Sequence, residues 1–94
     1  MSTTGQACTA ADITPAWVID VAFALRRDGQ AHRPSECGLK IEVQSINTGA
    51  WYALALPTLS GRFVDRATRD ATLACIEAEL KTGTMAREAA AHRK

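Results

Sequence analysis

The chain has 94 residues, 47% of them hydrophobic, which is enough for one modest core and too little for a cleft between two lobes. Its 11 basic and 10 acidic residues nearly balance, which argues against a strongly electrostatic partner such as bulk duplex nucleic acid. No apolar run has membrane-spanning length, so we expect a single domain over residues 1–94 that does not associate with membranes.

The first helix is predicted to follow a flexible lead-in over residues 1–12, where small polar residues predominate. Thr14 can cap free amides and Pro15 suits the first helical position, while Gly29 follows a basic last turn and ends the helix. Apolar residues recur at helical spacing between them. They are Trp17, Val18, Val21, Ala22 and Leu25, with Ile19 and Phe23 at the margins. A stripe this wide can serve both a sheet and a partner chain, although full burial is more common.

The polar segment over residues 30–37 is predicted to be a loop because of its Pro and Ser content and its flanking glycines. His32 and Cys37 are two potential metal ligands, but two ligands do not make a site, and a catalytic Cys–His pair also needs an oxyanion hole. We therefore expect neither a metal nor a catalytic role. The three cysteines, without a CxxC pair, favour reduced thiols in a cytoplasmic protein. Cys8 and Cys37 are expected outside the core, and Cys75 inside it.

A β-hairpin is the clearest element, because residues 39–46 alternate apolar and polar and an Asn/Gly turn separates them from an apolar arm. A three-residue loop would put Glu42 among the leucines, so we favour a loop of two or four residues that pairs Ile46 with Trp51. The face expected to enter the core carries Leu39, Ile41, Val43, Tyr52, Leu54 and Leu56. On the other face, Trp51 is either covered by a helix or free as a binding patch.

The segment after the hairpin contains Pro57 and Gly61, which end the second strand, and residues 62–64 are a candidate third strand. Asp65 or Thr68 is expected to cap a helix that ends at Thr82-Gly83. Its predicted apolar stripe is Ala71, Leu73, Ala74, Ile76, Ala78 and Leu80. Its predicted solvent face is Arg69, Asp70, Glu77, Glu79 and Lys81.

Residues 84–94 have high helix propensity but only one large apolar residue, Met85, so we expect a marginal helical tail. Together the elements predict an α+β fold in the order α-β-β-(β)-α. A small antiparallel sheet of two or three strands would have two helices packed on one face.

The run over residues 39–80 resembles the hairpin and helix core of HicB-type antitoxins. The residues that carry this resemblance are Pro57, Leu59 and Gly61, a Pro-x-Leu-x-Gly element after the second strand, with Thr68 opening the helix. The resemblance implies an α/β layer that binds another macromolecule. The chain departs from the family pattern in its first helix, in Ala71-Thr72 where an acidic-Ala pair is expected, and in the absence of a following DNA-reading module. The family's toxin partner is therefore not carried over.

The sequence contains no GxSxG, P-loop, HExxH or paired-cysteine motif, so we expect neither an enzyme nor a cofactor. Our first hypothesis is a non-enzymatic protein-binding module of the inhibitor or antitoxin type. Phages and other mobile elements encode such small proteins to block host defence nuclease complexes, so the expected partner is a larger protein or a ribonucleoprotein complex.

The alternative is a small nucleic-acid-binding protein that uses basic residues, Lys40 among them, with Trp51 as a stacking platform. Interfaces concentrate binding energy in Trp, Tyr and Arg. The candidate binding residues are Trp51, Ile46, Arg62, Arg26, Arg27 and Arg33. A homodimer through the exposed strand edge is a further expectation.

Overall fold

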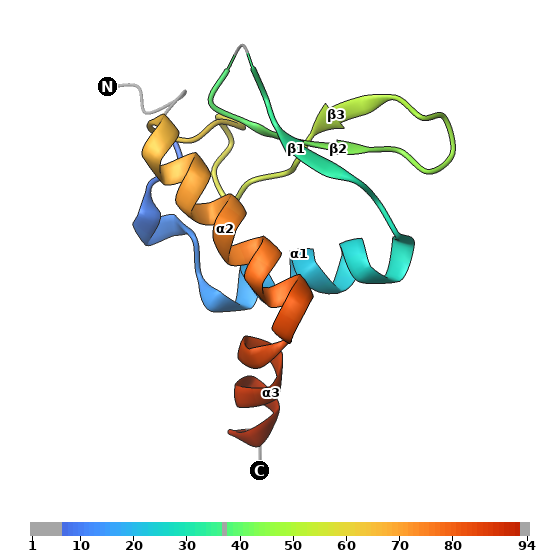
Figure 1. Ribbon diagram of the computed structural model, residues 1–94. Coiled ribbons are helices and arrows are strands. Elements are labelled where there is room, and N and C mark those ends of the chain that lie inside the picture. The colour runs from blue at the N-terminus through green and yellow to red at the C-terminus, as the bar shows by residue number, and fades with distance from the viewer. Residues whose placement is uncertain (1–6, 37, 93–94) are drawn as a thin grey trace.

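The computed structural model of the chain describes residues 7–36 and 38–92, and its architecture is the predicted α+β fold (Figure 1). A helix precedes a three-stranded antiparallel sheet, further helices follow it, and α1 packs on α2. The elements are the short 3-10 helix η1 (Ala10–Asp12), α1 (Pro15–Asp28), β1 (His32–Pro34), β2 (Ile41–Gln44), β3 (Trp51–Ala53), α2 (Arg66–Thr82) and α3 (Thr84–Ala91). In the described part of the chain, no helix is long and apolar enough to cross a membrane.

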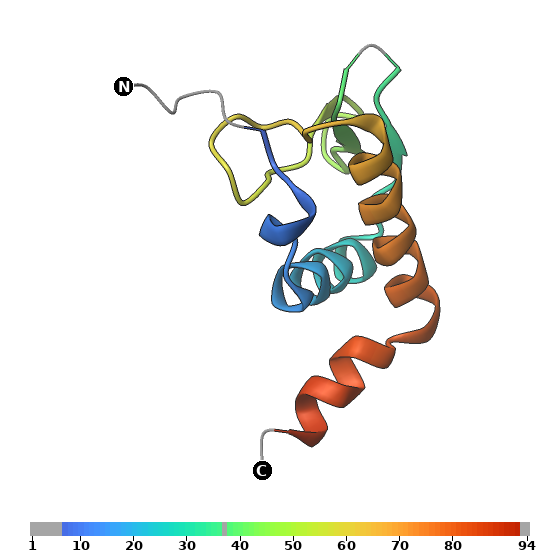
Figure 2. The same cartoon turned by 90° about the vertical axis from the view of Figure 1, so that its left-hand side faces the viewer.

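The core lies between the sheet and the two long helices. β2 is the central strand, and its alternate residues Ile41 and Val43 are buried at 1% and 3% exposure, whereas Glu42 and Gln44 face the other way. The fully or nearly fully buried partners of these strand residues are Cys8, Val18, Leu25, Phe63 and Ile76. The second view shows α3 turning away from the end of α2, at a distance from the sheet (Figure 2).

Helix α1 begins and ends as its local signals predict. The Thr14 side chain accepts a hydrogen bond from the Trp17 amide at 3.2 Å, and Gly29 adopts a left-handed conformation with φ of 65°. The buried residues of the helix are Val18, Ala22 and Leu25. Trp17 and Val21, at the margin of this stripe, are only half-buried, and Phe23 remains 59% exposed. The core therefore buries only part of the apolar surface of α1.

The register of the β2–β3 hairpin differs from the prediction. Gln44 lies opposite Trp51, so the predicted pairing of Ile46 with Trp51 is wrong. The loop has four residues and begins at Ile46, because the Ser45 hydroxyl accepts two loop amides at 3.2 and 3.3 Å and Gly49 takes a φ of 79°. The shift is by two residues, so the predicted division of side chains between the two faces is retained.

Strand β1 lies in the segment that was predicted to be a loop. The Gln44 amide donates to the Ala31 carbonyl at 3.0 Å and the Ser35 amide donates to the Lys40 carbonyl at 3.0 Å, which joins β1 to β2. A polar segment can form this strand because β1 is at the edge of the sheet, and Pro34 occupies its last position. The predicted third strand at residues 62–64 forms only an isolated bridge.

That bridge joins Phe63 to Cys8, so the described part of the expected lead-in is ordered against the core. The Cys8 amide donates to the Arg62 carbonyl at 2.9 Å and the Val64 amide donates to the Cys8 carbonyl at 2.8 Å. Thr9 and Asp12 form a reciprocal cap on η1. The prediction of a flexible lead-in is thus wrong from residue 7 onward, and residues 1–6 lie outside the described residues.

The cysteines do not lie where the sequence predicted. Cys8 is buried at 0% exposure, because it packs beside Phe63, and burial raises the pKa of its thiol. Cys75 is exposed, because it lies on α2 next to the buried stripe and not within it. Both predictions are wrong, and Cys37 lies outside the described residues.

Two charged residues of α2 are buried, contrary to the prediction of a solvated face. The buried positions of the helix are Arg69, Thr72, Ile76 and Glu79. The Arg69 guanidinium donates to the carbonyl oxygens of Ser35 and Gly38 at 2.7 and 3.0 Å, and so holds the β1–β2 connection. The alanines at positions 71, 74 and 78 are exposed instead. Hydrogen bonding makes these polar groups compatible with burial.

Glu79 fixes the start of α3. Its carboxylate accepts hydrogen bonds from the Met85 and Ala86 amides at 2.9 and 3.0 Å, which otherwise lack helical partners. Met85 packs against the core cluster. The predicted tail is therefore a helix over Thr84–Ala91 with one anchored end, and residues 93–94 lie outside the described residues.

Candidate functional site

The solvent-facing side of the sheet carries a cluster with one residue from each strand: Arg33, Glu42 and Trp51. We call it the outer-face cluster. Arg33 lies opposite Glu42 in the β1–β2 register, and its Nε donates to Glu42 Oε1 at 2.9 Å. The same guanidinium lies 3.8 Å from the centroid of the Trp51 ring. The cluster therefore spans the whole sheet and fixes the orientation of both the arginine and the tryptophan.

The outer-face cluster is accessible. The side chains of Arg33 and Glu42 are 51% and 30% exposed, and Trp51 is half-buried. The helices lie against the other face, where Ile41 and Val43 are buried. Of the two alternatives for Trp51, the geometry supports the open one, because it is Arg33 that lies over the indole ring.

A polar hollow adjoins the cluster at the β1–β2 connection. It has a volume of about 370 Å³ and is lined by Arg33, Pro34, Ser35, Glu36 and Glu42. Two carboxylates, a guanidinium and a hydroxyl line one small depression, so it can accept from and donate to the polar groups of a bound chain. Together, the hollow and the indole provide the mixed polar and aromatic surface that is typical of protein interfaces.

Of the four predicted arginines, only Arg33 lies beside Trp51. Arg26 donates to the carbonyl oxygens of Glu79 and Leu80 at 2.8 and 3.3 Å, and so caps the end of α2. In this position its guanidinium stabilises the C-terminal turn of α2.

The other predicted residues lie apart from the cluster. Arg27 pairs with Asp28 at 2.8 Å, which lowers the pKa of that carboxyl group, and lies 5.8 Å from the Phe23 ring centroid. Ile46 is 61% exposed in the hairpin loop, and Arg62 is exposed in the segment before α2. Trp51 and Arg33 thus lie together in the outer-face cluster. The other predicted residues lie at the end of α1, in the hairpin loop and in the segment before α2.

Glu42 is the member of the cluster that the sequence did not identify. Alternation placed it on the same face as Trp51, but its partner Arg33 was assigned to a loop. A cross-strand pair of opposite charges is a recognisable signal only when both strands are known. Because β1 is polar, the sequence predicted a loop there, and the pairing of Arg33 with Glu42 could not be recognised.

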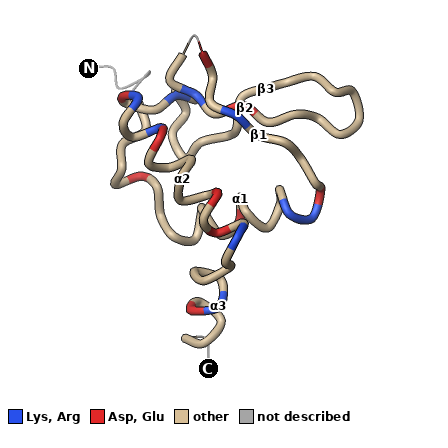
Figure 3. Tube along the Cα trace, viewed as in Figure 1, with Lys and Arg blue, Asp and Glu red and all other residues tan. Residues whose placement is uncertain are grey.

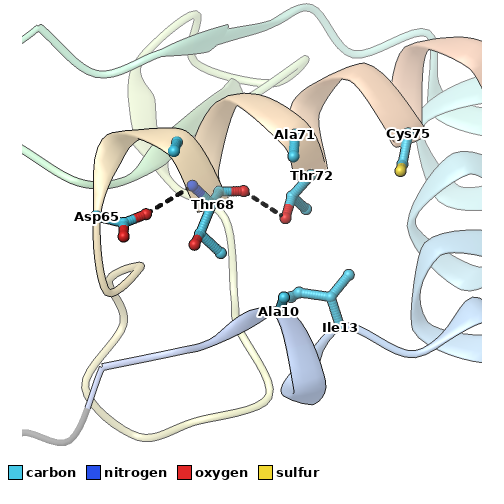
Figure 4. Close-up of a pocket in the computed structure, with 8 residues that line it drawn as sticks. Ala10, Ile13, Asp65, Thr68, Ala71, Thr72 and Cys75 are labelled. Carbon is cyan, nitrogen blue, oxygen red and sulfur yellow. Dashed lines mark hydrogen bonds between the residues drawn. The ribbon is translucent and has the colours of Figure 1, made fainter.

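A second hollow lies between η1 and the first half of α2 (Figure 4). Its volume is about 350 Å³, and methyl groups form much of its wall. Two of its polar side chains are hydrogen-bonded within α2, since Asp65 accepts from the Thr68 amide at 2.7 Å and Thr72 donates to the Thr68 carbonyl at 2.8 Å. The Thr68 bond lowers the pKa of Asp65. The free Cys75 also lines the hollow, further along α2 from Asp65 (Figure 4).

Charges of both signs are distributed over the elements (Figure 3). The 11 basic and 10 acidic residues leave a net charge of +1, so the chain lacks the excess of basic residues that phosphate binding favours. Within residues 7–36 and 38–92, no three His, Cys, Asp or Glu side chains gather as metal ligands.

No protein-family model matches the chain, and comparisons with curated proteins and with solved structures gave no match. The resemblance to HicB-type antitoxins therefore stays a prediction. In the structure, Leu59 of the Pro-x-Leu-x-Gly element is fully exposed, and Gly61 has a φ of 73°. Functional inference rests on the geometry of this chain alone.

Proposed function

We propose that the protein is a non-enzymatic binding module of the inhibitor type, which acts by covering a site on a larger protein or ribonucleoprotein complex. The observation that supports this most is the outer-face cluster, an accessible Trp51 held beneath Arg33 on a three-stranded sheet. Trp and Arg are the residues in which interfaces concentrate binding energy. A fixed aromatic anchor also loses little conformational entropy on binding.

The cluster can act through both of its exposed members. Trp51 supplies apolar area, and Arg33 uses its Nε for Glu42, which leaves its other guanidinium donors for a carboxylate or carbonyl of the partner. Glu42 positions Arg33, and the adjacent hollow accepts polar groups from the partner's rim. Recognition then combines one aromatic anchor with directed hydrogen bonds.

The cluster favours a protein partner over a nucleic acid. One face of the Trp51 ring carries Arg33 at 3.8 Å, so that face is not free for a base to stack upon. The carboxylates of Glu36 and Glu42 line the neighbouring hollow, where they repel phosphates. Binding to nucleic acid is therefore the weaker alternative.

A blocker of a host defence nuclease complex, encoded by a phage or another mobile element, is one form of this function. Support for this form comes from small size together with the absence of catalytic motifs in the sequence. An antitoxin that covers a toxin's active surface uses the same mode of action. Both forms predict a stoichiometric complex and no turnover.

The test is affinity capture from a lysate of the native host, with and without nuclease treatment, at low and moderate salt, with quantitative mass spectrometry. Three baits are compared: the full chain, Trp51→Ala and Phe23→Ala. Phe23 is the matched control because it is an aromatic residue with 59% exposure on α1, outside the cluster. Thermal melts of all three proteins establish that each is folded.

We expect one protein to be retained by the full chain and by Phe23→Ala and to be lost from Trp51→Ala, with all three proteins folded at the temperature of the assay. Equal recovery on all three baits rules out the cluster as the binding site. Recovery that disappears after nuclease treatment supports the nucleic-acid alternative instead.

A further inference from the structure

An apolar groove runs between α1 and the free side of β3. Its volume is about 330 Å³. On the helix side it is lined by Trp17, Val21 and Ala24, and on the sheet side by Tyr52 and Leu54. Gln30 donates to the Tyr52 hydroxyl at 3.0 Å and so fixes that ring. Among the described residues that line the groove, Asp20 alone is charged.

The groove exists because α1 carries more apolar surface than the core buries. Val18, Ala22 and Leu25 are buried, and Val18 and Leu25 pack in the core with residues of β2 and α2. The neighbouring stripe of Trp17, Val21 and Ala24 is only half-buried, and these residues line the groove. Because Tyr52 and Leu54 form the sheet side of the groove and strands in a sheet are about 4.8 Å apart, a strand added at the β3 edge would lie beside the groove.

The outer edge of β3 has outward-pointing backbone groups that can pair with an added strand. Leu54 and Ser45 donate across the β2–β3 ladder, to the Ile41 and Ala50 carbonyls at 2.7 and 2.8 Å. Because antiparallel ladders use alternate residues, the backbone N–H and C=O of Trp51 and Ala53 point away from β2. Within the described residues, β2 is the only strand that pairs with β3. An open edge of this kind is a template for another chain.

We propose that an extended segment of a partner protein adds to the β3 edge as a fourth strand. The inference rests on the proposed function and specifies the chemistry of the partner segment. Backbone hydrogen bonds to Trp51 and Ala53 hold the segment, and every second side chain is apolar and enters the groove. One of the groove-side positions carries a lysine or arginine that faces Asp20.

Charge complementarity distinguishes this occupant from a second copy of the chain. Asp20 is exposed in an otherwise uncharged groove, where it would attract a basic side chain of an added segment. The β3 edge of a second copy, residues 50–56, contains neither lysine nor arginine, and on β1, the other edge strand, Arg33 already pairs with Glu42 on the outer face. Pairing of β3 with β3 therefore leaves Asp20 without an opposite charge, whereas a segment from another protein can supply one.

The experiment uses the full, ¹⁵N-labelled chain and an acetylated, amidated octapeptide of alternating valine and threonine in which one valine is replaced by lysine. Binding is followed through the amide resonances of Trp51 and Ala53 and the indole resonance of Trp17. We expect saturable shifts at these three positions. Their absence up to about 1 mM peptide overturns the proposal.

Two matched peptides test the backbone contact. One is N-methylated at its threonines, and the other at its valines and lysine. Because only alternate amides of an added strand face β3, one of the two must lose binding and the other must keep it. Equal binding of both peptides contradicts strand addition.

Variants of the chain test the two sides of the site. Ala53→Pro removes an outward amide that β2 does not use, and should weaken the peptide at least about fivefold, whereas Ala53→Ser should not. Asp20→Asn should weaken the lysine peptide by up to about fivefold and leave an all-valine version unchanged. Unchanged binding to a folded Ala53→Pro variant overturns the proposal.

Sedimentation of the free chain tests the other occupant. A dimer that Ala53→Pro converts to a monomer would assign the edge to a second copy and overturn the proposal. The captured partner separates this inference from the proposed function. If Trp51→Ala loses that partner while Ala53→Pro keeps it, strand addition fails and the outer-face proposal stands; if both variants keep it, both proposals fail.

Discussion

The two faces of the sheet use the same strands for different purposes. On the inner face, Ile41 and Val43 of β2 are buried against α1 and α2. On the outer face, Glu42 of the same strand joins Arg33 and Trp51 in a cluster that remains accessible. Since adjacent residues of a strand point to opposite faces, one short segment supplies both buried core residues and part of the surface that we propose for recognition.

This difference teaches how a chain of 94 residues can combine a stable fold with the binding surface that we propose. A small domain has little apolar area to spare, so its inner face must be well packed. The outer face is rigid because the inner face holds it, and its aromatic residue can therefore remain exposed without a helix to cover it. The comparison predicts that substitutions on the two faces have separable effects.

The largest effect should come from Ile41→Ala, because this side chain is 1% exposed and its loss leaves a cavity. We expect a loss of about 2–5 kcal/mol in the free energy of unfolding. The neighbouring substitution Glu42→Ala is the matched control and should cost less than about 1 kcal/mol. Urea denaturation measures both, and a larger loss for Glu42→Ala would mean that the assignment of the faces is wrong.

Arg69→Ala sharpens the comparison by testing a buried arginine against the exposed Arg33. The Arg69 guanidinium holds the Ser35 and Gly38 carbonyls beneath the β1–β2 connection. Its removal should cost about 2–3 kcal/mol, because charged hydrogen bonds to buried acceptors are lost. Arg66→Ala, on the exposed first turn of α2, should be nearly neutral in the same denaturation experiment. Equal effects would contradict the structural role of Arg69.

Trp51→Ala should have a small effect on stability, in contrast to Ile41→Ala. The side chain is half-buried, and its contact with Arg33 is worth about 1 kcal/mol at an exposed site. The melting temperature should fall by about 4–8 °C, as judged by circular dichroism. Global unfolding of this variant at room temperature would assign Trp51 to the core.

The smallest effect should come from Glu42→Gln, which removes the charge that pairs with Arg33. Both side chains are partly exposed, so the loss should be below about 1 kcal/mol. It should shrink further in about 1 M salt, where the screening length is short. Denaturation at two salt concentrations checks this, and a loss that is large and insensitive to salt would indicate a buried pair.

The elements that the sequence predicted well are those with local signals. Thr14-Pro15 and Gly29 determine the ends of α1 through their own backbone conformations and neighbouring amides. The division of the hairpin into two faces follows from alternation, which survived a register error of two residues. The register itself depended on Ser45, whose hydroxyl caps the loop in a way that the alternating pattern does not reveal.

Two of the errors, at Arg69 and at β1, have a common cause, which is that the partners of their polar groups lie far away in the chain. Arg69 is buried because carbonyls more than 30 residues earlier accept its hydrogen bonds, and β1 is a strand because β2 pairs with it. The same cause limited the prediction of the functional site. Trp51 and Arg33 were both candidates, but their contact requires β1, so the cluster could not be assembled from sequence.

The central claim is that the outer-face cluster is a protein-binding surface, and the affinity of Trp51→Ala for the captured partner tests it most directly. Titration calorimetry of the full chain, Trp51→Ala and Phe23→Ala should be run beside their thermal melts. We predict at least about 30-fold weaker binding for Trp51→Ala, the loss expected for an interface anchor, and unchanged binding for Phe23→Ala. A folded Trp51→Ala variant that binds the partner as tightly as the full chain would contradict the claim.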